Sequence, residues 1–177
     1  MLSFPRPEGL VEGYSDVIAG HAQRLQVVAG GIEQQVQALL TVKAKLSKGW
    51  FGSAAPTALE KLDSLILWLR TIQGATNDTA QAYATYGQDL ARTNQEITAL
   101  EQRAQQYHDE ALAESRKYNN MGLRKEIMDN LTDGPYRLLR QDYEHAMSDY
   151  NGRAQAATDR LWQAYQKAAD IQPSSGQ

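Results

Sequence analysis

The sequence predicts an all-α protein, an elongated antiparallel helical bundle in which two hairpins share one long central helix. Apolar or aromatic residues recur every seven positions along two long stretches, as expected for helices that pack on helices. Glycine, serine and proline residues lie where these stretches end or begin. The chain has 177 residues, enough for one packed domain, and no cysteine, so disulfides are excluded.

The first helix is predicted from about Ser15 to Lys48, where Gly49 can end it. Ser53 and Pro56 can start the next helix, because proline is tolerated in a first turn. The chain therefore reverses within a few residues and forms an antiparallel hairpin. Its heptad seam on the first helix is Ile18, Leu25, Ile32, Leu39 and Leu46, and the expected register places Leu39 near Leu62 and Ile18 near Tyr83.

The central helix is predicted from about Ala55 to about Tyr118, roughly 95 Å at 1.5 Å per residue. Beyond about Gly87 it outruns the first helix, so its partner there must come from later in the chain. Its heptad positions are Leu62, Leu69, Thr76, Tyr83, Leu90, Ile97, Ala104, Ala111 and Tyr118, all apolar or aromatic except Thr76.

The last third of the chain is predicted to fold back on the central helix. Turn residues at 119–122 precede a short helix at 123–131, and Gly134-Pro135 is interpreted as the start of a last helix from about Tyr136 to Asp170. This reading places Tyr150 near Arg103. The expected organisation is an irregular lead-in at 1–13, one helical domain at 14–170 divided into hairpins 14–95 and 96–170, and a disordered tail or linker at 171–177.

Several function classes are excluded by the sequence. A net charge of −3 without a basic cluster argues against nucleic-acid binding. The longest apolar run, Leu65–Leu69, is too short to span a membrane, and the N-terminus lacks the pattern of a Sec signal peptide. Of the three histidines, His108 and His145 could face each other, but a metal or pH-sensing role there is disfavoured. We therefore expect no catalytic, cofactor or metal site, and a protein that is not an enzyme.

One stripe of the central helix goes beyond what a hairpin core needs. Leu65, Trp68, Ile72 and Ala75 lie on a face that packing on the first helix does not use. An exposed stripe with a tryptophan is typical of a partner surface, which Val28 and Val42 of the first helix could complete. In the alternative interpretation, the last helix or the N-terminal lead-in covers this stripe.

The turn between the first two helices carries Trp50-Phe51-Gly52, followed by small residues. A Trp-x-Gly turn between antiparallel helices resembles the WXG superfamily of type VII (ESX) secretion substrates. The small Esx proteins match only residues from about 15 to 95, whereas PPE and EspB-like members share the extended second helix and a further helix folded back on it. The leader domain of a large secreted toxin, with the polar tail leading into the toxin, is a third possibility.

The resemblance implies export without a signal peptide, to the cell surface or outside, through recognition of Trp50 and Gly52 by the secretion machinery with its ATPase. Two features differ from the family pattern. Pro5 and Pro7 are not adjacent as in the PPE signature, and none of the nine tyrosines has an acidic residue four positions later. A small helical protein, Esx-like or PE-like, is thus expected to supply the Tyr-x-x-x-Asp/Glu signal. The alternative function is an intracellular helical scaffold or adaptor that associates with itself.

Overall fold

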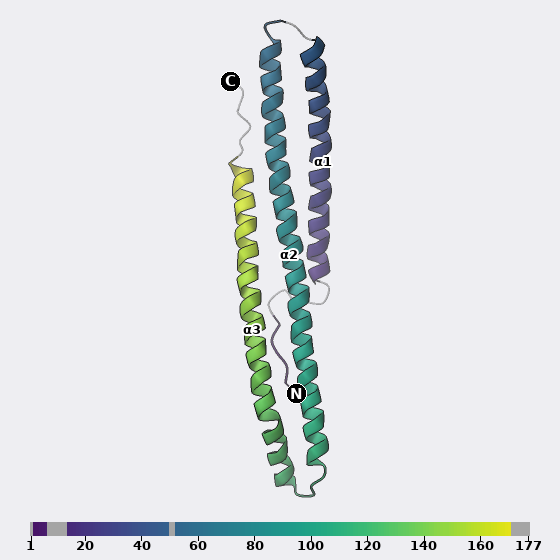
Figure 1. The fold of residues 1–177 in the computed structure, drawn as a ribbon, viewed down its shortest axis with the longest axis vertical. Helices are drawn as coiled ribbons and strands as arrows, with labels where there is room; N and C mark the ends of the chain where they lie inside the picture. Colours follow the sequence, from purple (N-terminus) through teal and green to yellow (C-terminus); the bar gives the residue numbers. More distant parts are fainter. Residues whose placement is uncertain (1, 7–13, 50–51, 171–177) are drawn as a thin grey trace. The chain divides into compact units, whose positions relative to one another are not determined.

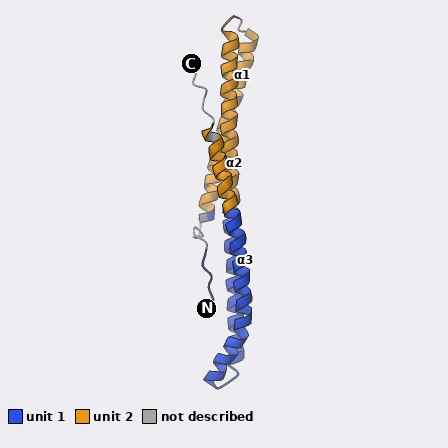
Figure 2. Ribbon diagram, turned by 90° about the vertical axis from the view of Figure 1, so that its left-hand side faces the viewer, with its two compact units in different colours: residues 1–15, 87–154 blue, residues 16–86, 155–177 orange. Residues whose placement is uncertain are grey.

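The computed structural model describes residues 2–6, 14–49 and 52–170, apart from the side chains of Tyr14 and Ala168. Over these ranges the protein has three helices and no strand: α1 (Tyr14–Gly49), α2 (Ala55–Ser115) and α3 (Met121–Ala169) (Figure 1). The predicted all-α bundle is confirmed. The chain divides into two compact units, unit 1 with residues 1–15 and 87–154 and unit 2 with residues 16–86 and 155–177 (Figure 2). The helix α2 contributes to both units.

Unit 2 contains the hairpin of α1 and the first half of α2. The amide of Gln73 donates a hydrogen bond of 2.8 Å to Glu33, and Lys43 forms an ion pair with Asp63. These two contacts place Leu39 close to Ile66, about one helical turn further along α2 than predicted. The connection itself has the expected length, since five residues separate Gly49 from Ala55.

Only one residue of the predicted seam of α1, Ile18, is fully buried. Leu25, Ile32, Leu39 and Leu46 are only half-buried. The other fully buried residues of α1 lie beside the predicted seam, three or four positions from its members, so the face of α1 that packs on α2 is rotated relative to the prediction. The buried apolar residues of α1 are Ile18, Ala22, Ala29 and Val36.

In unit 1, α2 pairs with α3. Arg153 forms an ion pair of 3.1 Å with Asp89, and Arg92 lies 3.5 Å from Asp149. The predicted neighbourhood of Tyr150 and Arg103 is therefore wrong by about three turns. The buried apolar residues of α3 are Leu139 and Tyr150 in unit 1 and Ala157 and Ala164 in unit 2.

The register of α3 was mispredicted because its start was misplaced. The side chain of Asn120 accepts hydrogen bonds from the backbone N–H groups of Gly122 (2.8 Å) and Leu123 (3.1 Å), an N-cap that starts α3 at Met121. Pro135, which we interpreted as a helix start, lies inside α3. Proline removes one hydrogen bond from a helix interior and favours a bend, and α3 bends between its first turns and the remainder (Figure 1).

Residues 2–6 complete the core of unit 1; they are called the N-terminal segment below. Phe4 is only 7% exposed and packs in a cluster with Ile97, Leu100, Ala104 and Leu139. In this unit the N-terminal segment covers apolar surface on α2 and α3 that two helices alone would leave open. Of the predicted lead-in at 1–13, the described residues 2–6 are irregular in backbone and contribute to the core, and the others lie outside the described residues.

Candidate functional site

The predicted recognition turn is described only in part. Trp50 and Phe51 lie outside the described residues. Gly52 has a φ of 138°, a conformation that residues with a Cβ rarely adopt. Its carbonyl accepts a hydrogen bond of 3.3 Å from the N–H of Ala55, the first residue of α2. Glycine at position 52 is therefore required by the backbone that leads into α2.

The two helices bury little at the end of the hairpin next to this turn. Between Ile32 and Gly49 on α1, and between Ala55 and Ile72 on α2, the buried side chains are Val36, Ala55 and Ile66. A hairpin of two helices has no third element here to cover its apolar faces. Six leucines in these stretches remain half-buried: Leu39, Leu40, Leu46, Leu59, Leu62 and Leu69.

The helix α3 ends before it reaches this region. In unit 2, Asp78 and Ala82 of α2 line a shallow, open depression together with Arg160 and Lys167 of α3. Since α3 ends at Ala169, its last turns lie beside the part of α2 around Asp78. The surface of α2 that precedes this level, toward Ala55, has no partner among the described residues other than α1.

The predicted partner-binding residues of α2 fall on both sides of that boundary. Leu65 is 40% exposed, and Trp68 and Ile72 are half-buried. Ala75 is buried, so it does not belong to an open surface, and its inclusion in the predicted stripe was wrong. Leu67, which was not in the predicted set, is 67% exposed.

The two valines of α1 are both exposed, Val42 by 44% and Val28 by 53%. Val42 precedes Lys43, which pairs with Asp63, and therefore lies at the level of Leu65. Val28 lies about four turns away, about 20 Å along the helix. Val42 thus adjoins the exposed end of the stripe, and Val28 does not.

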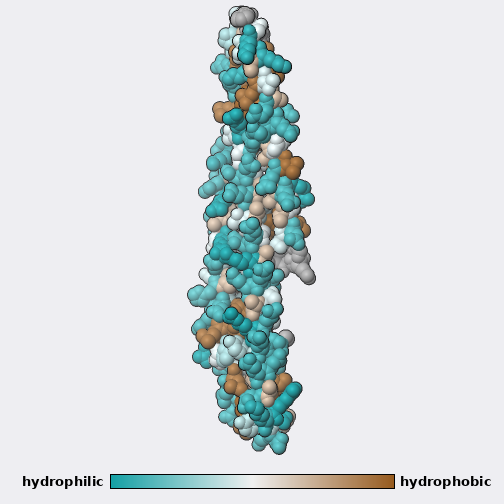
Figure 3. Space-filling view, turned by 45° about the vertical axis from the view of Figure 1, so that its right-hand side comes forward, coloured by the Kyte–Doolittle hydropathy of each residue, from teal (hydrophilic) through white to brown (hydrophobic). Residues whose placement is uncertain are grey.

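The surface defined by Val42, Leu65, Trp68 and Ile72 is called the open hairpin surface below; Leu67 follows the buried Ile66 by one position and projects to the opposite side of the hairpin. In the antiparallel pair, Val42 and Leu65 each precede by one position a residue that faces the other helix, so both project to the same side. Figure 3 shows one face of the molecule, on which hydrophobic side chains form separate patches within a mostly hydrophilic surface. The open hairpin surface can pack an apolar helix, and it offers no group suited to covalent chemistry.

One acidic residue near this surface, Glu33, has a lowered pKa. Glu33 accepts hydrogen bonds of 2.8 Å each from the side-chain amides of Gln37 and Gln73. These hydrogen bonds to the charged carboxylate lower the pKa of Glu33 below its ordinary value. The contact with Gln73 connects α1 to α2 at the boundary where the coverage by α3 ends.

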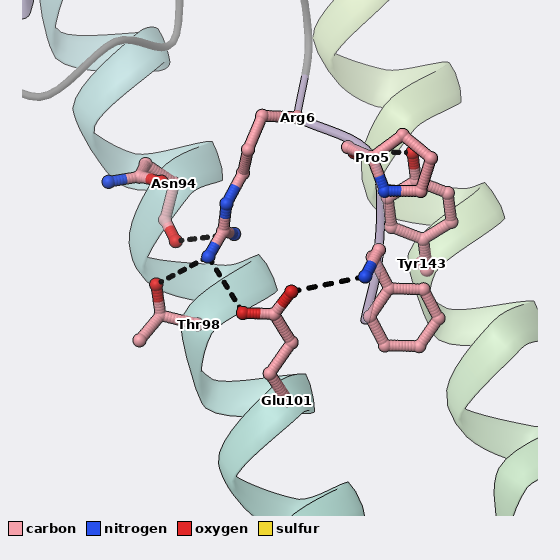
Figure 4. Close-up of polar contacts among 7 residues, drawn as sticks. Pro5, Arg6, Asn94, Thr98, Glu101 and Tyr143 are labelled. Atoms are coloured by element: carbon pink, nitrogen blue, oxygen red, sulfur yellow. Dashed lines mark hydrogen bonds and ion pairs between the residues drawn. The ribbon is translucent and has the colours of Figure 1, made fainter. Parts of the chain in front are cut away.

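Sequence reasoning missed the binding groove that holds the N-terminal segment. This groove, formed by α2 and α3 in unit 1, contains Glu101 and Tyr143, both of which bond to residues 4–6 (Figure 4). The signal that could have found it is an alternation, because Leu2, Phe4 and Arg6 alternate with exposed Ser3 and Pro5. Five residues are too few for such a pattern to stand out.

The described residues hold no group of three or more histidine or acidic side chains that could bind a metal ion. His108 lies 3.6 Å from its neighbour Asp109, and no contact between His108 and His145 is present in the described part of the chain. Among the described helices, none is both long and apolar enough to cross a membrane. Comparison with known proteins finds no matching family model, no matching curated protein and no matching solved structure.

Proposed function

We propose that this chain is a secreted substrate, or the leader domain of one, of a type VII secretion system. It acts by helical pairing with a small partner and by recognition at the turn of Trp50 and Gly52. The observation that carries the proposal is the open hairpin surface next to this turn. A secretion substrate that pairs with a partner hairpin requires such a surface. Without a partner, the apolar side chains at this end of the hairpin would stay exposed to water.

The partner is expected to be a small α-helical protein, Esx-like or PE-like. Its helices would cover Leu65 and Val42 and exclude water from Trp68 and Ile72. Full burial of a large apolar side chain contributes about 1.5–3 kcal/mol, so a few such residues can supply the central part of an interface. Since no tyrosine of this chain has an acidic residue four positions later, the partner would also carry the Tyr-x-x-x-Asp/Glu signal to the secretion ATPase.

Export is tested with a tryptophan pair. In a host with a type VII system, with the partner co-expressed, Trp50→Ala should leave the protein inside the cell with unchanged helicity. The matched control is Trp162→Ala, because Trp162 is exposed on α3, far from the turn in sequence. The control should be exported like the wild type. Equal export of both variants would refute recognition at the turn.

Pairing is tested with a leucine pair. Leu65→Glu should abolish the complex with the partner, because it places a charge in the interface. Leu138→Glu is the matched control, since Leu138 is exposed on α3 in unit 1. A complex that survives Leu65→Glu, measured by light scattering, would contradict the proposed interface.

The runner-up is an intracellular scaffold that associates with itself through the same surface. The open hairpin surface would then be covered by a second copy, and Leu65→Glu would convert a homo-oligomer into a monomer. A stable homo-oligomer that ignores the partner, together with no export of the wild type, would favour this second function.

A further inference from the structure

The groove of unit 1 binds the backbone of the N-terminal segment. The N–H of Phe4 donates a hydrogen bond of 3.1 Å to one carboxylate oxygen of Glu101. The hydroxyl of Tyr143 donates one of 2.6 Å to the carbonyl of Pro5. The two bonds come from different helices, α2 and α3, so the segment is held from both sides (Figure 4). Hydrogen bonds to the backbone N–H and C=O groups allow a protein to bind an extended peptide independently of its side chains.

The groove also binds the Phe4 side chain. The ring of Phe4 stacks on the ring of Tyr143, with centroids 4.7 Å apart and planes inclined by 16°. The Phe4 side chain also belongs to the core cluster with Ile97, Leu100 and Leu139. A large aromatic ring buried in this way is an anchor, because it contributes most of the apolar area of the contact.

Arg6 is recognised by three groups on one face of α2. One guanidinium nitrogen lies 2.8 Å from the second carboxylate oxygen of Glu101 and 3.2 Å from the hydroxyl of Thr98. The other donates a hydrogen bond of 3.4 Å to the backbone carbonyl of Asn94. Glu101 thus holds both the backbone of Phe4 and the side chain of Arg6, which fixes the spacing of two positions between them.

The N-terminal segment contacts the groove in the way that a bound peptide contacts its binding site. All of them join residues 4–6 to residues that are 88 to 138 positions away in sequence. The chain contains only two phenylalanines, and Phe51 is followed two positions later by Ser53, not by an arginine. The required pair, a phenylalanine two positions before an arginine, therefore occurs once per chain.

We propose that this groove is a recognition site for an extended segment with a phenylalanine two positions before an arginine. We further propose that the N-terminal segment of a second copy of this chain can occupy it in place of the chain's own. Exchange between copies preserves every contact, so it costs little beyond the entropy of association. In dilute solution the chain's own segment prevails, because a short link gives it an effective concentration of about 1 mM.

The test mixes two full-length variants with complementary defects. The first has a disabled segment and an intact groove, through Phe4→Ala and Arg6→Ala. The second has an intact segment and a disabled groove, through Glu101→Arg and Tyr143→Ala. Each alone should be a monomer by light scattering, and their mixture should form a 1:1 heterodimer.

The proposal is overturned if both variants keep wild-type helicity and their mixture stays monomeric at the highest soluble concentration. A second measurement covers the case in which one variant fails to fold. A photo-crosslinking residue in place of Leu2, which is only partly buried, leaves Phe4 and Arg6 intact. Mixing isotopically heavy and light copies should give heavy–light crosslinks that increase with concentration. Crosslinks confined to single chains at every concentration would also overturn the proposal.

Discussion

Two valines of α1 provide a direct test of the observed hairpin. Val36 is completely buried against α2, whereas Val42 is 44% exposed on the open hairpin surface. Both lie in the same helix of unit 2, so truncating each to alanine makes the same chemical change in two environments. The predicted seam of the hairpin does not contain Val36, and the comparison therefore tests the observed register.

The expected losses differ by more than 1 kcal/mol. Val36→Ala removes two methyl groups, about 1.6 kcal/mol of burial at ~0.8 kcal/mol per carbon. The residual cavity adds to this, and the better helix propensity of alanine returns up to about 0.7 kcal/mol. The net loss is about 1.5–2.5 kcal/mol. Val42 is only about half-buried, so Val42→Ala removes about half as much buried apolar surface as Val36→Ala and leaves no closed cavity. The net loss in the free energy of unfolding is therefore under about 0.5 kcal/mol.

The assay is urea unfolding followed by circular dichroism, with the free energies of unfolding compared at equal slope. Val36→Ala should unfold at clearly lower urea, and Val42→Ala should be close to the wild type. Equal losses, or a larger loss for Val42→Ala, would refute the register and the assignment of Val42 to an open surface. Val42→Ala should still weaken binding of the proposed partner.

Three further predictions concern single positions. Gln73→Ala should return the pKa of Glu33 toward its ordinary value of 4.5, as measured by NMR titration. In the wild type, the stabilisation from Glu33 is complete above the pKa that Glu33 has in the unfolded chain. This stabilisation is lost as the pH falls through the lower pKa that Glu33 has in the folded protein. Gly52→Ala should lower the free energy of unfolding by about 1–2 kcal/mol because of the positive φ at this position. Gly49→Ala should raise the free energy of unfolding by up to about 1 kcal/mol, because a Cβ added there meets no neighbouring atom and alanine favours the helix. Pro135→Ala should raise the urea midpoint and increase the free energy of unfolding by up to about 2 kcal/mol, because the missing helical hydrogen bond is restored. An unchanged midpoint would mean that packing imposes the bend in α3.

The elements that could be predicted from the sequence are those set by local chemistry. The start of α2 at Ala55, with Pro56 in its first turn, follows from the backbone preferences of single residues. The end of α1 at Gly49 was also predicted, although Gly49 does not have the positive φ of a glycine cap. The same reasoning failed at Pro135, where the gain from a continuous helix on α2 exceeds the local cost of a proline. Local signals are reliable where packing does not oppose them.

The error in α3 also explains the error in the partner surface. With the predicted register, α3 would end before reaching Ala75; in the structure it extends about three turns further along α2, and Ala75 is buried. Leu65, which lies beyond the end of α3, is exposed as predicted. The docking of Phe4 could not be found by periodicity, since five residues give too short a pattern.

Alanine dominates the interior of this protein. Of the nineteen buried apolar residues in the described part of the chain, ten are alanines, including Ala22 and Ala29 on α1 and Ala157 and Ala164 on α3. A small side chain lets neighbouring backbones approach closely, so little free volume remains for a larger one. Mutational tolerance should therefore be asymmetric: enlargement to leucine at these positions is excluded by overlap, whereas serine or glycine is accepted at modest loss. At these ten positions the packing thus sets an upper limit on residue size in addition to a requirement for an apolar side chain.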